Sequence, residues 1–177
     1  MSQKKSQDAA AVAQNSVASA SPDPIVWVLF PGAPSDEEGG NIGRMYEDDG
    51  ESVAAKAEAP GGEHSAVTTA SWSGGCTAGS RLEVSISTRG THAAMAASRK
   101  HALQLRGCTL APKLATVNGL EIAATNDALA EPTGELGYSV TLAGHERTLV
   151  MGGAALRIGL GQHATSEGAD VRVSLEF

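Results

Sequence analysis

The chain has 177 residues, enough for one ordinary domain and too few for a complete eight-stranded α/β barrel, which needs about 250 residues. Hydrophobic residues make up 41% and charged residues 19% of the chain, and 21 glycines and 7 prolines punctuate it, which favours a turn-rich β domain. Aromatic residues reach only 3%, and the net charge of −7 opposes nucleic-acid binding, because that affinity comes largely from Lys and Arg.

The N-terminal residues 1–24 are rich in Ala, Ser and Gln and close on two prolines, which is typical of a disordered leader. A basic pair precedes an alanine-rich stretch, but polar residues interrupt that stretch, so we do not expect a secretory signal. The longest apolar run, Ile25–Phe30, is far short of the roughly 20 residues that cross a bilayer. The sequence predicts a soluble domain over residues 25–177 with no membrane partner.

The first half of this domain reads as short strands separated by turns. Ile25–Phe30 is a dense run of β-forming residues, which predicts a strand buried on both faces. Leu82–Ser87 alternates apolar and polar residues, as in a strand with one wet face, and Gly90 is expected to end it. Two shorter runs, Gly43–Tyr46 and Val67–Trp72, are also strand-like.

The second half repeats this pattern. His101–Leu105 alternates, with its Ala and Leu residues expected to oppose its polar residues and Arg106. Asn118-Gly119 is the strongest hairpin signal in the chain. The remaining runs are Lys113–Val117, Leu120–Ile122, Tyr138–Leu142, Thr148–Met151, Ala155–Leu160 and Val171–Phe177, with a polar loop at 123–137 and a turn at Gly144–Glu146. About nine strands at this spacing predict an all-β fold, an antiparallel β-sandwich; the helix-compatible stretch Ala93–Lys100 is short.

Most motif matches in the chain do not indicate a catalytic or ligand-binding site. Gly159–Ala164 fits the dinucleotide pattern G-x-G-x-x-A, but too few residues follow it to build the helix and second strand of that fold. The five histidines never stand at metal-ligand spacing, so we expect neither a metal site nor a cofactor. Cys76 and Cys108 form no C-x-x-C pair; they would pair if the protein is exported and would otherwise be buried thiols.

An acidic segment stands out, formed by Tyr46, Glu47, Asp48, Asp49 and Gly50. A calcium loop would need further acids at alternate positions, which this chain does not supply. A retaining glycosidase needs two carboxyl groups facing each other about 5 Å apart, whereas neighbouring residues of a strand point to opposite faces. We therefore expect a structural hairpin in which Asp-Gly forms the turn, with no catalytic or metal-binding role.

This segment also carries a family resemblance. Gly32 followed by Tyr46–Ser52 resembles the "PG…YEDDG-x-S" passage at the C-terminal end of glycoside hydrolase family 31, the α-glucosidases and α-xylosidases. Further marks recur in the family's order over residues 25–177. They are Thr68-Thr69 with Trp72, the strands Leu82–Gly90 and Arg99–Leu105, and the hairpin Val117-Asn118-Gly119.

The resemblance implies a distal β-sandwich behind a catalytic barrel, with residues 25–32 resembling the end of the preceding proximal sandwich. The family's catalytic aspartates lie in the barrel, so none is carried onto this chain. The expected function is a non-catalytic C-terminal accessory domain whose partners are the barrel and the proximal sandwich. The alternative is an independent carbohydrate-binding sandwich, for which Tyr46, Trp72 and Tyr138 are the candidate stacking residues.

Overall fold

The computed structural model of the chain is all-β: ten strands and no helix lie within the residues that it describes. This confirms the expected fold class, with one strand more than the predicted number. The leader expected at residues 1–24 lies outside the described residues except for Pro24, which precedes the first strand. The described residues are 24–32, 41–48, 60–92, 95–124, 137–141, 155–165 and 170–177.

The ten strands coincide with the expected runs wherever those runs are described. They are β1 (Ile25–Leu29), β2 (Asn41–Asp48), β3 (Ser65–Gly74), β4 (Arg81–Thr91), β5 (Ser98–Arg106), β6 (Leu114–Val117), β7 (Leu120–Glu121), β8 (Gly137–Thr141), β9 (Ala155–Ala164) and β10 (Asp170–Glu176). The expected strand Thr148–Met151 and the turn before it lie outside the described residues. Gly159–Ala164 belongs to β9, so the G-x-G-x-x-A pattern is strand and not a phosphate-binding loop.

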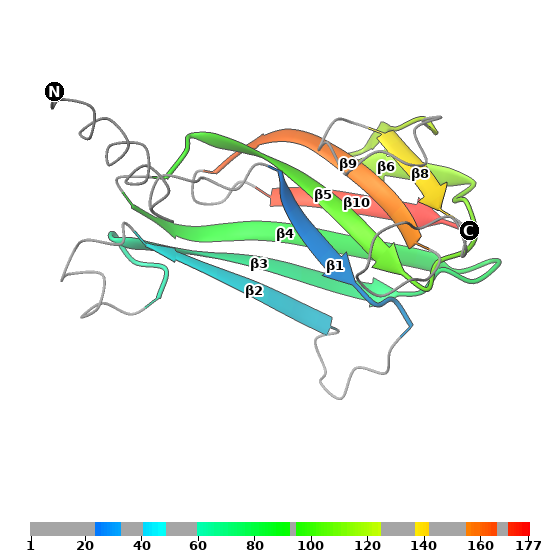
Figure 1. The fold of residues 1–177 in the computed structure, drawn as a ribbon, viewed down its shortest axis with the longest axis horizontal. Helices are drawn as coiled ribbons and strands as arrows, with labels where there is room; N and C mark the ends of the chain where they lie inside the picture. The colour runs from blue at the N-terminus through cyan, green and yellow to red at the C-terminus, as the bar shows by residue number, and fades with distance from the viewer. Residues whose placement is uncertain are drawn as a thin grey trace, which may run out of the picture.

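The strands form two sheets that pack face to face (Figure 1). Sheet A has four strands in the order β1-β5-β9-β8, and sheet B has six in the order β2-β3-β4-β10-β6-β7. Neighbouring strands are antiparallel except β1 and β5, which run parallel. Parallel strands need a long connection, and here β2, β3 and β4 lie between them in sequence. The structure is therefore the expected antiparallel sandwich with one parallel pair at an edge.

The core forms between the inner faces of the two sheets, because alternate residues of each strand point inward. Sheet B contributes residues such as Leu82, Val84 and Ile86 from β4, whose burial alternates as predicted. Sheet A contributes Leu103 and Leu105 from β5, which are fully buried. The remaining large members are Ile25, Trp27, Leu29, Val117, Ile122, Leu156, Ile158, Leu160, Val171, Val173, Leu175 and Phe177.

Two expectations about strand faces were wrong. β1 is buried on one face only: Val26, Val28 and Phe30 are 38%, 46% and 50% exposed, because they alternate with core residues and point away from sheet B. β5 has no polar face over residues 101–105, which are all buried, and His101 lies on the same side as its leucines. The two residues of this stretch that face away from the core, Ala102 and Gln104, are only 0% and 8% exposed.

Glycines fix two of the turns. In the β6–β7 hairpin, Asn118 and Gly119 have φ of 51° and 79°, the pair of positive values that a type I′ turn requires, which confirms the predicted hairpin. Gly90 does not end its strand as expected, because β4 continues to Thr91. Its φ is +79°, and a Cβ there would lie 2.3 Å from the Ser65 carbonyl oxygen, so only glycine fits this close approach of β3 to β4.

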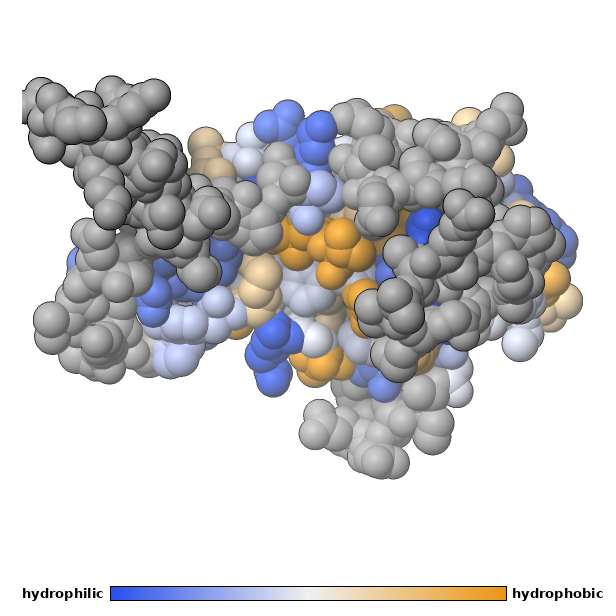
Figure 2. Space-filling view, viewed as in Figure 1, coloured by the Kyte–Doolittle hydropathy of each residue, from blue (hydrophilic) through white to orange (hydrophobic). Residues whose placement is uncertain are grey.

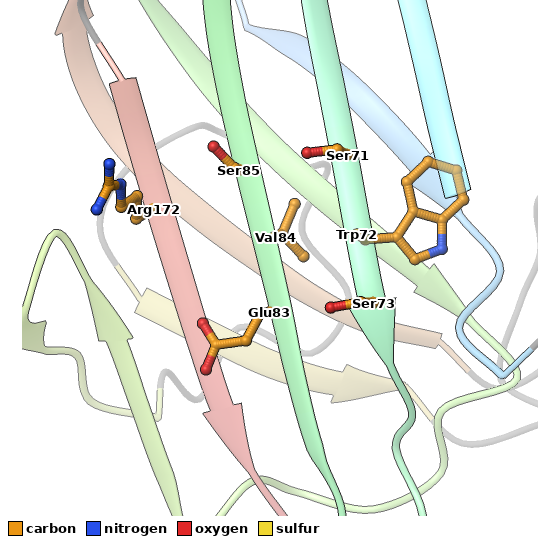
Figure 3. A pocket seen from close by; sticks show the side chains of 7 residues that line it. All are labelled: Ser71, Trp72, Ser73, Glu83, Val84, Ser85 and Arg172. Atoms are coloured by element: carbon orange, nitrogen blue, oxygen red, sulfur yellow. The ribbon is translucent and has the colours of Figure 1, made fainter. Parts of the chain in front are cut away.

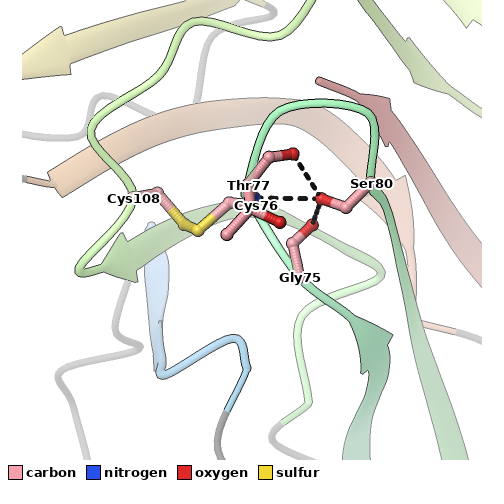
Figure 4. Close-up of a disulfide and its surroundings, with 5 residues drawn as sticks. All are labelled: Gly75, Cys76, Thr77, Ser80 and Cys108. Carbon is pink, nitrogen blue, oxygen red and sulfur yellow. Dashed lines mark hydrogen bonds between the residues drawn. A yellow bond between two sulfur atoms is a disulfide. The ribbon is translucent and has the colours of Figure 1, made fainter.

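The two cysteines, whose state the sequence left open, form a disulfide across 32 residues. It joins the β3–β4 connection to the loop after β5, and so ties sheet B to sheet A at one end of the sandwich (Figure 4). Beside it the Ser80 hydroxyl accepts a hydrogen bond from the Thr77 amide at 3.0 Å and lies 2.7 Å from the carbonyl oxygen of Gly75. These bonds order the loop that carries Cys76.

Candidate functional site

The acidic segment lies at the end of β2, an edge strand of sheet B. Residues of β2 alternate between its two faces, so Tyr46 and Asp48 lie on the outer face and Glu47 points inward. Tyr46 is 48% exposed. Asp49 and Gly50 lie outside the described residues.

The turn expected at Asp49-Gly50 lies outside the described residues, so it stays a prediction. What the structure describes is the strand before it. β2 and β3 are antiparallel neighbours, and their register places Asp48 opposite Ser65.

Glu47 reaches across the sandwich to Arg99 at the start of β5. The guanidinium Nη1 donates to the carboxylate Oε1 at 2.5 Å, and the side chains are only 5% (Arg99) and 16% (Glu47) exposed. Because β2 belongs to sheet B and β5 to sheet A, this ion pair joins the two layers. The contact is single: Glu47 Oε2 and Arg99 Nε are buried without a hydrogen-bond partner.

A second contact joins the layers on the same side of the sandwich. The Trp27 indole of β1 lies over Gly43 of β2, where a Cβ would sit 3.7 Å from the ring. Its Nε1–H donates to Nδ1 of His101 at 3.3 Å within the core, so that nitrogen carries no proton. Together with the Glu47–Arg99 pair, these contacts close the side of the sandwich formed by the edge strands β1 and β2.

This geometry gives the acidic segment a structural use. The Glu47 charge is neutralised by Arg99, and Asp48 points to the opposite face of the strand, so the two carboxylates do not converge on one point. In the described residues no group of three or more His, Cys, Asp or Glu side chains is placed to hold a metal ion. Sequence reasoning missed the role of Arg99, because the two partners are 52 residues apart. The only signal was that Arg99 opens a strand-like run that resembles the same family as the acidic segment.

A shallow polar hollow of about 200 Å³ lies on the outer face of sheet B (Figure 3). Ser71 and Ser73 of β3 and Ser85 of β4 form its floor, and the longer side chains of Glu83 and Arg172 stand around it. The Trp72 ring lies on the β2 side of β3, away from the two charged residues. The hollow forms because the short serine side chains lie beside the longer Glu83 and Arg172 on the solvent-facing side of the sheet.

The three aromatic residues that were candidates for sugar stacking do not form a platform. Tyr46 is exposed on β2, whereas Trp72 and Tyr138 are half-buried and pack against the core. The Tyr138 hydroxyl lies 3.5 Å from the carbonyl oxygen of Pro112. Stacking on this chain would therefore rest on one ring of the three.

A larger hollow of about 620 Å³ lies next to the disulfide, among the loops that follow β1, β3 and β5. Its wall includes Pro31, Cys76 and Leu110, and several glycines widen it. It contains Thr and Ser hydroxyl groups but no charged side chain within the described residues. This composition offers an apolar contact surface and no group for acid–base chemistry.

Comparison with known proteins places the chain in no family. No protein-family model matches it, and no curated protein matches it significantly. Within the described ranges, no helix is long and apolar enough to cross a membrane.

Proposed function

We propose that the chain is a non-catalytic C-terminal accessory domain of a glycoside hydrolase family 31 α-glucosidase-like enzyme, which packs against the catalytic barrel and stabilises it. One observation carries the proposal: two of the segments that resemble the family meet in the fold. Glu47 belongs to the acidic segment and Arg99 opens the strand Arg99–Leu105, and they form the buried ion pair between the sheets. An ion pair that joins the two sheets gives a reason for a sandwich to carry both segments together.

The same pair argues against catalysis by this chain. Retaining glycosidases oppose a nucleophilic carboxylate and a proton donor across the sugar, and the donor needs a raised pKa. Here Glu47 is held by a guanidinium inside the sandwich, and Asp48 lies on the other face. The chain should not hydrolyse maltose or a chromogenic α-glucoside between pH 4 and 7. Turnover that survives purification and falls in Glu47→Gln or Asp48→Asn would overturn the proposal.

Binding to a barrel is the direct test. The chain would be co-expressed with a family 31 catalytic barrel from the same genome that lacks its own distal sandwich. We expect the two to co-purify and the melting temperature of the barrel to rise with added chain, because a partner that binds only the folded state stabilises it. Failure of the chain to bind or stabilise such a barrel would contradict the proposal.

The hollow on sheet B favours a second candidate, an independent carbohydrate-binding sandwich. Its serine hydroxyl groups, with Glu83 and Arg172 beside them, could exchange hydrogen bonds with sugar hydroxyls. Calorimetric titration with maltooligosaccharides tests it. Binding that is lost in Ser85→Val and kept in Ser87→Val, which changes the next outward residue of β4, would favour this candidate over the accessory domain.

A further inference from the structure

The edges of the two sheets differ in how they are protected. A free strand edge presents unpaired N–H and C=O groups, and proteins usually guard it with charges, short strands or a covering segment. β7 has two residues, and β2 carries the charged residues Arg44 and Asp48 on its outer face. The outer edge of β8 is partly covered by the segment after β7. The Tyr138 amide donates to the Ala123 carbonyl oxygen, and Ala124 forms an isolated β-bridge with Tyr138. β1 has none of these protections among the described residues.

β1 is also preformed as a strand. Its inward residues Ile25, Trp27 and Leu29 are buried in the core, and the Trp27–His101 hydrogen bond holds its centre. Its outward residues are Val26, Val28 and, just beyond its end, Phe30. Figure 2 shows hydrophobic residues gathered over the middle of the face that β1 crosses. A partner would therefore meet a rigid, uncharged and apolar edge.

We propose that two copies of the chain pair through this edge, with the two β1 strands antiparallel, so that two four-stranded sheets become one continuous sheet. A strand edge is self-complementary, since its donors and acceptors alternate, and a two-fold interface requires self-complementarity. The chain carries a net charge of −7, which makes copies repel, but residues 25–30 contain no charge. β1 is thus a place where two copies can meet without like charges in contact.

The dimer should be weak. β1 has five residues, and a single added strand covers much less than the roughly 1,200–2,000 Å² of a stable specific interface. We expect concentration-dependent association of the purified chain. The inference does not rest on the proposed function, because it concerns the chain alone.

Sedimentation velocity of the full chain tests this, over concentrations from about one micromolar to about one millimolar. We expect the mass to rise from monomer to dimer. Val28→Lys places a charge at the centre of the paired edge and should weaken dimerisation at least about tenfold. The matched control is Ile42→Lys, which changes a 40% exposed apolar residue of β2 and should leave dimerisation unchanged.

Three results would overturn the proposal. The first is a monomer at every concentration, and the second is an equal loss of association in Val28→Lys and Ile42→Lys, which would indicate non-specific hydrophobic contact. The third is a full-strength dimer in a folded Val28→Lys. Circular dichroism and tryptophan fluorescence verify folding, and Val26→Lys, on the same face, should reproduce the loss if Val28→Lys fails to fold. Binding to a barrel is a separate assay, so failure of either proposal leaves the other standing.

Discussion

The Glu47–Arg99 pair makes the sharpest prediction about stability. Glu47→Gln keeps the shape of the side chain and removes its charge, which leaves the Arg99 guanidinium buried without a counter-ion at 5% exposure. Breaking a buried ion pair from one side costs about 3–5 kcal/mol, and because Glu47 keeps some exposure we expect the lower end, about 3 kcal/mol. For a domain of this size, that loss lowers Tm by roughly 6–12 °C.

The assay is urea unfolding followed by the fluorescence of Trp27 and Trp72, with urea chosen because guanidinium would screen the pair. The control is Glu176→Gln, whose partner Arg81 forms an exposed pair at 60% and 43% exposure and should cost less than about 1 kcal/mol.

Replacing both partners tests the cause of that loss. Glu47→Leu combined with Arg99→Met removes both charges and also the two buried atoms that have no hydrogen-bond partner. Such exchanges are often neutral or stabilising, so the double variant should recover most of the loss. A Glu47→Gln loss no larger than that of Glu176→Gln would refute the reasoning. A double variant as unstable as Glu47→Gln would mean that shape, and not charge, holds this side of the sandwich.

Three further predictions concern the disulfide, a glycine and metal binding. Replacing Cys76 and Cys108 by serine should lower the free energy of unfolding by about 3.7 kcal/mol, the loop entropy for a separation of 32 residues; coincident urea curves with and without dithiothreitol would contradict this. Both Gly79 and Gly90 have positive φ, but only Gly90 is crowded by backbone atoms. Gly79→Ala should therefore cost roughly 1–2 kcal/mol of stability, and Gly90→Ala should cost clearly more. Equal losses in urea unfolding would show that β3 and β4 do not approach closely at Gly90. Calorimetric titration with calcium should show no binding tighter than millimolar, because a calcium site needs six to eight oxygens; a micromolar site lost in Asp48→Asn would contradict it.

Local sequence was sufficient where a single segment decides the outcome. Asn118-Gly119 forms its turn because both residues tolerate positive φ, whatever surrounds them. The alternation in Leu82–Ser87 predicted the buried and solvent-facing sides of β4, since a strand in a two-layer sandwich has one side of each kind. The all-β class followed from the number of such runs and the turns between them.

Local sequence failed where the neighbours of a segment decide. Ile25–Phe30 and His101–Leu105 lie side by side in sheet A, yet their burial is the reverse of what their composition predicted. The apolar run became the edge with an open face, and the mixed run became a central strand buried throughout. Ser65 lies opposite Asp48 in the register that places Glu47 on the inner face of β2, a pairing that no motif in the sequence indicated.

By itself, then, the sequence determined the periodicity of the strands and the glycine-dependent turns, because these depend on residues within a few positions of one another. Only the tertiary structure decided which strands are edges, that Cys76 meets Cys108, and that Glu47 of the acidic segment meets Arg99. The disulfide and the ion pair each join residues more than 30 positions apart, and such partners are chosen by the packing of whole sheets, to which any short stretch of sequence contributes only a part.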